Sequence, residues 1–188
     1  MPQSVLVVHG AGEPRRRNGE VYWAPLLGDA LGPDYRVLAP GMPEPEDPTH
    51  RAWADRIAEL MSGLDRPVVV GHSFGASTLL KFYAESKLQP AHRGIFLVAT
   101  PFWGPEFPDF ALTPEAFRAL QDVSPLTFYH SHDDEVVEFS HFQRFRQELP
   151  RAVFRELDGR GHEFNQSTFP ELVADIRSLP DTTTPPSA

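Results

Sequence analysis

The chain contains no cysteine among its 188 residues, which excludes disulfide bonds and thiolate metal sites. It also has no apolar run that approaches the length of a membrane span. The first apolar run begins at Ser4, which leaves no room for the charged and apolar parts of a secretory leader. These absences lead us to expect a cytoplasmic protein with no membrane partner.

Basic residues are outnumbered: 17 Lys and Arg stand against 26 Asp and Glu, which gives a net charge of −9. Such a surface repels nucleic acid and anionic lipid, so we expect neither as a partner. The hydrophobic share of 40% is ordinary for a globular protein of one domain with a sizeable core. We expect that domain to span residues 1–179 and the polar, proline-rich tail 180–188 to be disordered.

Short apolar runs alternate with segments of helical spacing along the whole chain. The runs that predict strands are 4–9, 35–39, 68–70, 94–99, 125–131 and 152–157. The helical patterns begin near Trp23, Asp47, Ala76, Thr113, Phe139 and Leu172, with Asp47 and Thr113 as predicted N-caps, each followed by proline. Residues 13–19 are predicted to form a charged loop. This alternation predicts an α/β fold with a mostly parallel sheet and helices on both faces.

The third apolar run leads directly into Gly71-His72-Ser73-Phe74-Gly75, a match to the G-x-S-x-G motif. Strand, sharp turn and helix in that order are the context in which this motif presents a nucleophilic serine. The simpler alternative is that the two glycines only allow a tight turn and that Ser73 caps the following helix.

A serine hydroxyl needs a base within hydrogen-bonding reach, and the base needs a group that fixes its tautomer. The predicted acid is Asp134, just after the fifth strand, with the neighbouring Asp133 as the alternative. The predicted base is His162, one of eight histidines, which follows the sixth strand after two glycines. We expect His9 and His72 to be structural. The order Ser73, Asp134, His162 is that of the G-x-S-x-G enzymes.

Acyl transfer also requires donors for a developing oxyanion. We expect the backbone N–H of Phe74 to supply one and that of Ala11 the other, with Gly10 or Gly12 as the alternative to Ala11. Aromatic residues after the fourth strand, Phe102, Trp103 and Phe107 with Phe110, form either an apolar wall for the substrate or a cover for the helix layer.

These motifs give the chain a resemblance to a known family. The residues that carry it are the early strand and glycine loop, residues 39–45, Trp53, Gly71 to Ala76, residues 96–100, Asp133-Asp134 and Gly161-His162. Over nearly its full length the chain resembles the family of small serine hydrolases that includes retinoblastoma-binding protein 9. The resemblance implies a minimal α/β-hydrolase fold of about six strands in the order 2-1-3-4-5-6 without a lid domain. It also implies a triad of Ser73, Asp134 and His162 with esterase-like activity on a small acyl substrate, and no cofactor. The sequence His9-Gly10-Ala11-Gly12 departs from the family and is closer to general esterases.

Three other functions are compatible with parts of the sequence. His130-x-His132 with Asp133 and Asp134 has the form of a metal-binding motif, although a metal site would leave the serine motif unexplained. A binding module that keeps the fold without catalysis is a second alternative. A thioesterase, acyltransferase or haloperoxidase would use the same triad on another bond or acceptor.

Overall fold

The computed structural model describes residues 1–12, 16–17, 20–21, 23–86, 90–164 and 169–180. Its strands are β1 (Gln3–Val8), β2 (Arg16–Arg17), β3 (Glu20–Val21), β4 (Tyr35–Leu38), β5 (Val68–His72), β6 (Gly94–Val98), β7 (Leu126–Ser131) and β8 (Val153–Leu157). Its helices are α1 (Trp23–Leu31), α2 (His50–Ser62), α3 (Phe74–Glu85), α4 (Pro114–Leu120), α5 (Phe139–Glu148) and α6 (Pro170–Arg177).

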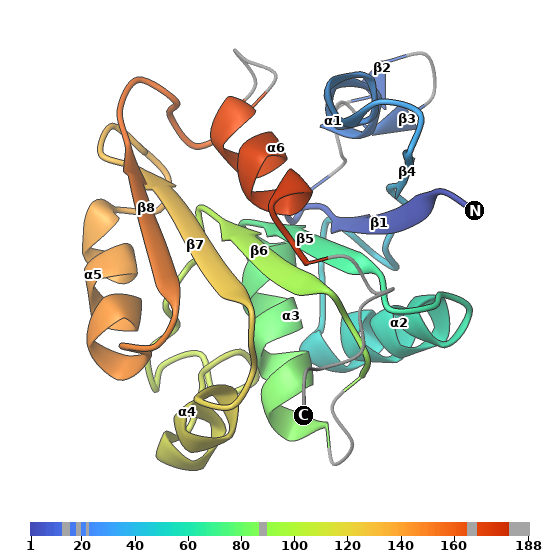
Figure 1. Ribbon diagram of the computed structural model, residues 1–188. Coiled ribbons are helices and arrows are strands. Elements are labelled where there is room, and N and C mark those ends of the chain that lie inside the picture. The colour runs from blue at the N-terminus through green and yellow to red at the C-terminus, as the bar shows by residue number, and fades with distance from the viewer. Residues whose placement is uncertain (13–15, 18–19, 22, 87–89, 165–168, 181–188) are drawn as a thin grey trace, which may run out of the picture.

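Six strands form one parallel sheet in the order β4-β1-β5-β6-β7-β8 (Figure 1). Counted along the chain within this sheet, that is the predicted order 2-1-3-4-5-6, and the predicted fold class is confirmed. The central strands β5, β6 and β7 are buried along their whole length, as strands covered on both faces should be. All six carboxyl ends meet at one edge of the sheet, which is where ligands bind in open α/β folds.

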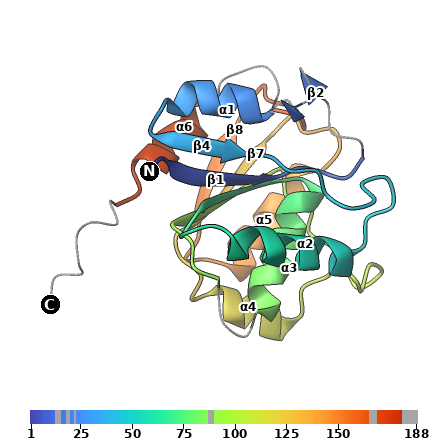
Figure 2. The same cartoon turned by 90° about the vertical axis from the view of Figure 1, so that its right-hand side faces the viewer.

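Helices cover both faces of the sheet (Figure 2). Successive side chains of a strand point to opposite faces, so Val69 belongs to one core and Val68 and Val70 to the other. The first core is closed by α2, α3, α4 and α5, and the second by α1 and α6. Within the described part of the chain, no helix is long and apolar enough to cross a bilayer.

The helix starts show which sequence signals were sufficient. Thr113 caps α4 as predicted, with its hydroxyl accepting the N–H of Ala116 at 3.2 Å. The prediction of Asp47 as the cap of α2 was wrong: Thr49 caps that helix and accepts the N–H of Ala52 at 3.3 Å. The reason is local, because the N–H of Asp47 bonds the carbonyl of Glu44 and commits Asp47 to the preceding turn.

The charged segment after β1 departs from prediction as well. Arg16–Arg17 pairs antiparallel with Glu20–Val21 in a small separate ribbon, where the sequence predicted a loop over 13–19. The rest of that predicted loop, residues 13–15 and 18–19, lies outside the described residues. So do residues 181–188 of the tail that the sequence predicts to be disordered.

Candidate active site

Ser73 occupies a strained turn between β5 and α3. Its φ of 51° and ψ of −122° lie outside the regions that L residues favour, at a typical cost of about 1–3 kcal/mol. Its N–H donates to the carbonyl of Val98 on β6 at 2.9 Å, which holds the turn. The hydroxyl makes no helix-capping hydrogen bond. The geometry therefore does not support the alternative in which Ser73 serves only as a cap.

Two glycines bring the turn against the loop that follows β1. A Cβ on Gly75 would overlap the carbonyl oxygen of His9 and lie 2.5 Å from that of Val8, so the start of α3 abuts the end of β1 only because Gly75 has no side chain. A Cβ on Gly10 would lie 3.2 Å from the Cβ of Ser73. The glycine loop and the serine are thus immediate neighbours, although they are far apart in sequence.

The structure brings Ser73, His162 and Asp134 together. The Oγ of Ser73 lies 3.0 Å from Nε2 of His162, and Nδ1 of His162 lies 3.0 Å from both carboxylate oxygens of Asp134. A carboxylate can only accept, so Nδ1 of the imidazole carries the proton that faces Asp134. In the neutral ring this leaves the lone pair of Nε2 facing the serine hydroxyl.

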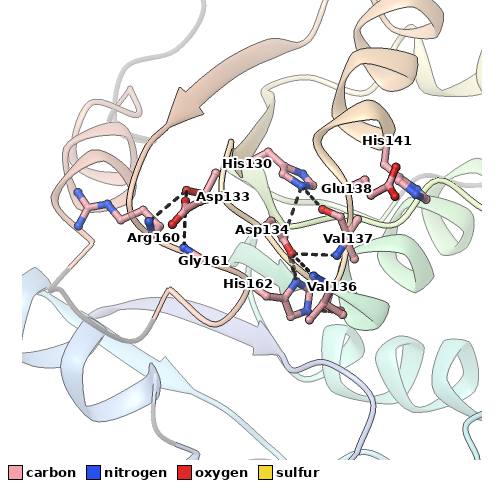
Figure 3. A network of polar contacts seen from close by, with 12 residues as sticks. His130, Asp133, Asp134, Val136, Val137, Glu138, His141, Arg160, Gly161 and His162 are labelled. Carbon is pink, nitrogen blue, oxygen red and sulfur yellow. Dashed lines mark hydrogen bonds and ion pairs between the residues drawn. The ribbon is translucent and has the colours of Figure 1, made fainter.

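Asp134 is buried but well supported. Burial alone would raise the pKa of this carboxyl group, yet hydrogen bonds from His162, Val137 and Val136 hold the pKa below its usual value. The two backbone donors, Val136 and Val137, both reach Oδ1, at 2.9 and 2.8 Å (Figure 3). Asp134 is therefore a carboxylate at neutral pH, with the charge needed to stabilise a protonated His162.

The sequence predicts the backbone amides of Phe74 and Ala11 as donors to a developing oxyanion. Phe74 is the first residue of α3, where helical N–H groups have no intrahelical acceptor. Among the described residues, neither the Phe74 nor the Ala11 amide has a backbone acceptor. The amide of Gly12 donates to the carbonyl of Pro45 at 2.6 Å, so the alternative that used Gly12 is disfavoured.

Residues 5–131, about two thirds of the chain, match the model of the alpha/beta hydrolase family. The chain belongs to the alpha/beta hydrolase family. No curated protein sequence gave a significant match.

Many solved structures share the fold of this alpha/beta hydrolase. The ydeN gene product of B. subtilis is 23% identical, with 94% of this chain and 97% of that one covered and a TM-score of 0.74. A thioesterase domain from the curacin biosynthetic pathway is 14% identical, with 94% and 91% covered and a TM-score of 0.68. A monoacylglycerol lipase from Paleococcus ferrophilus is 18% identical, with 93% of each chain covered and a TM-score of 0.65. At these identities the likeness is one of fold.

Asp133 and Asp134 have different surroundings in this hydrolase. Asp133 is exposed and turned away from the imidazole of His162; it accepts from the hydroxyl of Ser131 and, at 3.3 Å, from the N–H of Gly161 (Figure 3). The hydrogen bond from Ser131 holds the pKa of Asp133 below its usual value. Asp133 therefore anchors the loop that carries His162, and only Asp134 contacts the imidazole ring.

The His-x-His segment does not converge on one point. His130 is buried, with Nε2 2.7 Å from the carbonyl of Val137 and 3.4 Å from Oδ2 of Asp134. His132 is exposed, pairs with Glu156 at 3.2 Å and stacks on Phe139. In the described ranges, no group of three or more His, Asp or Glu side chains is arranged to hold a metal ion.

His130 has a supporting role that the sequence did not indicate. Burial lowers the pKa of this histidine, so the ring is neutral and its Nε2–H donates to Val137. Val137 in turn donates to Asp134, so His130 braces the turn that holds the acid. A histidine within a buried strand, four residues before the acid, is the signal that could have suggested this.

Two of the three aromatic residues predicted to contact the substrate line an apolar pocket. Phe102 and Trp103 border it, with Ser77, Leu80, Pro101, Phe110, Leu112, Phe117 and Phe145. Phe107 is not among the lining residues; it is 47% exposed and contacts the ring of Trp103. The indole N–H of Trp103 donates to the hydroxyl of Ser77 at 2.9 Å, and Ser77 lies one helical turn from Ser73. Phe102 and Trp103 also pack on the first core, so they cover the helix layer as well.

Proposed function

We propose that this chain is a serine hydrolase that cleaves small acyl esters through an acyl-enzyme on Ser73. The observation that carries the proposal is the continuous contact from Asp134 to His162 to Ser73, with each gap 3.0 Å. Nucleophile, base and orienting acid within hydrogen-bonding reach are the signature of covalent acyl transfer. The strained backbone of Ser73 adds support, since such strain gathers at functional residues.

In the first half of the proposed reaction, Oγ of Ser73 attacks the ester carbonyl while its proton passes to Nε2 of His162. The carbonyl becomes a tetrahedral oxyanion, and the imidazole becomes an imidazolium beside the carboxylate of Asp134. The tetrahedral intermediate then expels the alcohol, which leaves with the proton from Nε2. The acyl group stays on Ser73 as an ester.

In the second half, a water molecule gives its proton to Nε2 of His162 and attacks the acyl-serine. The second oxyanion collapses, the carboxylic acid leaves, and Oγ of Ser73 recovers the proton. We propose that the N–H groups of Phe74 and Ala11 bind both oxyanions, with Gly10 as the remaining alternative to Ala11. Each such donor is typically worth about 2.7–4 kcal/mol in the transition state.

The apolar pocket suggests the acyl side of the substrate. The pocket borders α3 one turn beyond Ser73. Two of its lining residues, Trp103 and Phe110, also contact the ring of Phe74. Among the described residues that line it, the polar side chains are Ser77 and Trp103, and these are hydrogen-bonded to each other. We propose that it receives the apolar part of a short acyl group, with Phe102 and Trp103 as walls.

The decisive experiment is labelling with a fluorophosphonate probe, which reacts with activated serines. The folded parent protein should be labelled, and Ser73→Ala should lose both labelling and ester turnover, with kcat lower by about 10³-fold or more. A folded parent that resists labelling would point instead to a binding module that has kept the fold. Turnover that survives Ser73→Ala would remove Ser73 as the nucleophile.

A second series tests the proposed acyl pocket. Esters of graded acyl length should show an optimum at short acyl groups, and Leu112→Ala, which enlarges the small pocket, should shift that optimum to longer acyl groups. A hydrophobic pocket discriminates about 10–200-fold per methylene at most, so the shift is measurable as a change in kcat/KM ratios. The same relative preferences before and after Leu112→Ala would place the acyl group elsewhere.

The same triad could act on a thioester or transfer the acyl group to an acceptor other than water. The thioester substrate is supported by the curacin thioesterase domain, which has the same fold. Parallel assays of matched oxygen and sulfur esters separate the two substrates. The relation to the retinoblastoma-binding protein 9 family remains our proposal, supported by the sequence motifs described above.

A further inference from the structure

The loop that carries His162 is anchored firmly on the side of β7. The N–H of Arg160 donates to the hydroxyl of Ser131 at 3.1 Å, and the N–H of Gly161 to Asp133 at 3.3 Å. The imidazole itself donates to Asp134. All three acceptors lie at the end of β7 or just beyond it, so these bonds tie the loop to the acid but not to the nucleophile.

On the side of β5, the same loop is held by His72. Nε2 of His72 lies 2.9 Å from the backbone carbonyl of His162, and the two rings lie 5.0 Å apart between centroids. Because a carbonyl oxygen only accepts, the proton is on Nε2 of His72. His72 is 8% exposed and immediately precedes Ser73, so this bond joins the backbone of the base to the residue next to the nucleophile.

Resting on the proposed function, we infer that His72 is a positioning residue that sets the distance between Nε2 of His162 and Oγ of Ser73. The loop needs such a restraint because Gly159 and Gly161, both at positive φ, leave its backbone permissive. Without His72, the imidazole could keep its bond to Asp134 while its other nitrogen moves away from the serine. A displacement of about 1 Å at a reacting group can cost about 100-fold in rate.

The charge of His72 fits this role. Burial, with a smaller contribution from the nearby His162, lowers the pKa of His72 to about 4. The ring is therefore neutral at neutral pH and adds no positive charge beside the imidazolium that forms on His162. Its Nε2–H is engaged with the carbonyl, so His72 holds the base without exchanging protons with the substrate.

The test compares His72→Phe, which keeps a ring but loses the donor, with His72→Gln, whose side-chain amide restores a donor at similar reach. His92→Phe is the matched control, because His92 precedes β6 at the opposite edge of the sheet. We expect His72→Phe to lower kcat for p-nitrophenyl acetate, and the rate of fluorophosphonate labelling, by about 10–100-fold with little change in KM. His72→Gln should recover much of the loss, and His92→Phe should match the parent.

The outcomes separate this inference from the function on which it rests. A parent without Ser73-dependent labelling overturns both. If the parent is labelled and His72→Phe has the same kcat and labelling rate, or loses only stability, the positioning role alone is overturned. If His72→Phe does not fold, ¹⁵N NMR of the parent still decides: we expect a neutral His72 protonated on Nε2 at pH 7, and a ring protonated on Nδ1 would overturn the inference.

Discussion

At the scale of single residues, the two adjacent carboxylates are the instructive pair. From the sequence, Asp133 and Asp134 both follow β7 and both suit a turn; the spacing from Asp134 to Val137 favoured Asp134, with Asp133 as the alternative. In the structure the two side chains point in different directions. Asp134 is buried and accepts from backbone N–H groups and His162, whereas Asp133 lies at the surface and anchors the loop of His162. The bonds of Asp134 to Val136 and Val137 are local, but the contacts with His162 and Gly161 join residues 28 positions apart, which no local pattern encodes.

This difference gives a prediction for matched substitutions. Asp134→Asn should lower kcat by about 10³–10⁴-fold, because an amide cannot stabilise the imidazolium and favours the wrong tautomer of His162. Asp133→Asn should change kcat little, since the amide oxygen still accepts from Gly161. Steady-state kinetics on a short ester measures both. The opposite ranking would transfer the acid role to Asp133.

At the scale of elements, the start of α2 shows how a strong local signal can mislead. Asp47 followed by Pro48 has the composition of a helix start, but Asp47 closes the turn from Glu44 and the helix begins two residues later than that pattern indicates. Thr49, with extended backbone angles of −108° and 143°, supplies the capping oxygen. Around Ser73 the predicted order of strand, sharp turn and helix is observed, although β5 runs two residues further than predicted and α3 begins two residues before Ala76.

The cap assignment can be measured through stability. Thr49→Ala should lower the free energy of unfolding by about 0.5–2 kcal/mol, the usual loss for a removed N-cap. Asp47→Ala, two residues away, is the matched control and should stay within about 0.5 kcal/mol of the parent. Urea unfolding monitored by circular dichroism gives both values. A larger effect at Asp47 than at Thr49 would return the cap to Asp47.

At the scale of the whole molecule, the order of strands and the position of the candidate site could be predicted, whereas the support around the site could not. Apolar runs and helical spacing identify the layers, and the motif at Ser73 fixes which sheet edge matters. The bonds from His72 to His162 and from His130 to Val137 arise only when the loops meet at that edge. The rings of His72 and His130 are both buried, neutral hydrogen-bond donors. Nothing in the sequence distinguishes these two from the other six histidines in that respect.

These buried histidines make the stability of the fold depend on pH. The pKa of His72 falls from its ordinary value of 6.5 to about 4 on burial, and burial also lowers the pKa of His130. Between pH 6.5 and pH 4 the unfolded chain therefore binds more protons at these histidines than the folded one, so their contribution to stability is fully present above pH 6.5 and is lost as the pH drops toward 4. His72 alone accounts for about 3 kcal/mol of that loss.

Urea midpoints taken from pH 7.5 to pH 4.5 measure this dependence. The urea midpoint of the parent should fall steadily as the pH is lowered through this range. The midpoint of His72→Gln should depend less steeply on pH, because this variant lacks one of the histidines with a lowered pKa. A parent whose midpoint stays level between pH 6.5 and pH 4.5 would contradict the neutral, buried state of these rings.

The fit between α3 and the end of β1 has a mechanical consequence. Because Gly75 allows that close approach, Ser73 lies against the loop that follows β1, while Asp134 and the loop that carries His162 are attached to the end of β7. The hydrogen bond from His72 to the carbonyl of His162 connects the two sides. Strand β6 lies between β5 and β7, and the amide of Ser73 donates to the carbonyl of Val98 at the end of β6. A small change in the twist of the sheet at β6 would therefore change the distance between the hydroxyl of Ser73 and the imidazole of His162 even if neither side chain rotated. The rate of the proposed reaction would then depend on the curvature of the sheet.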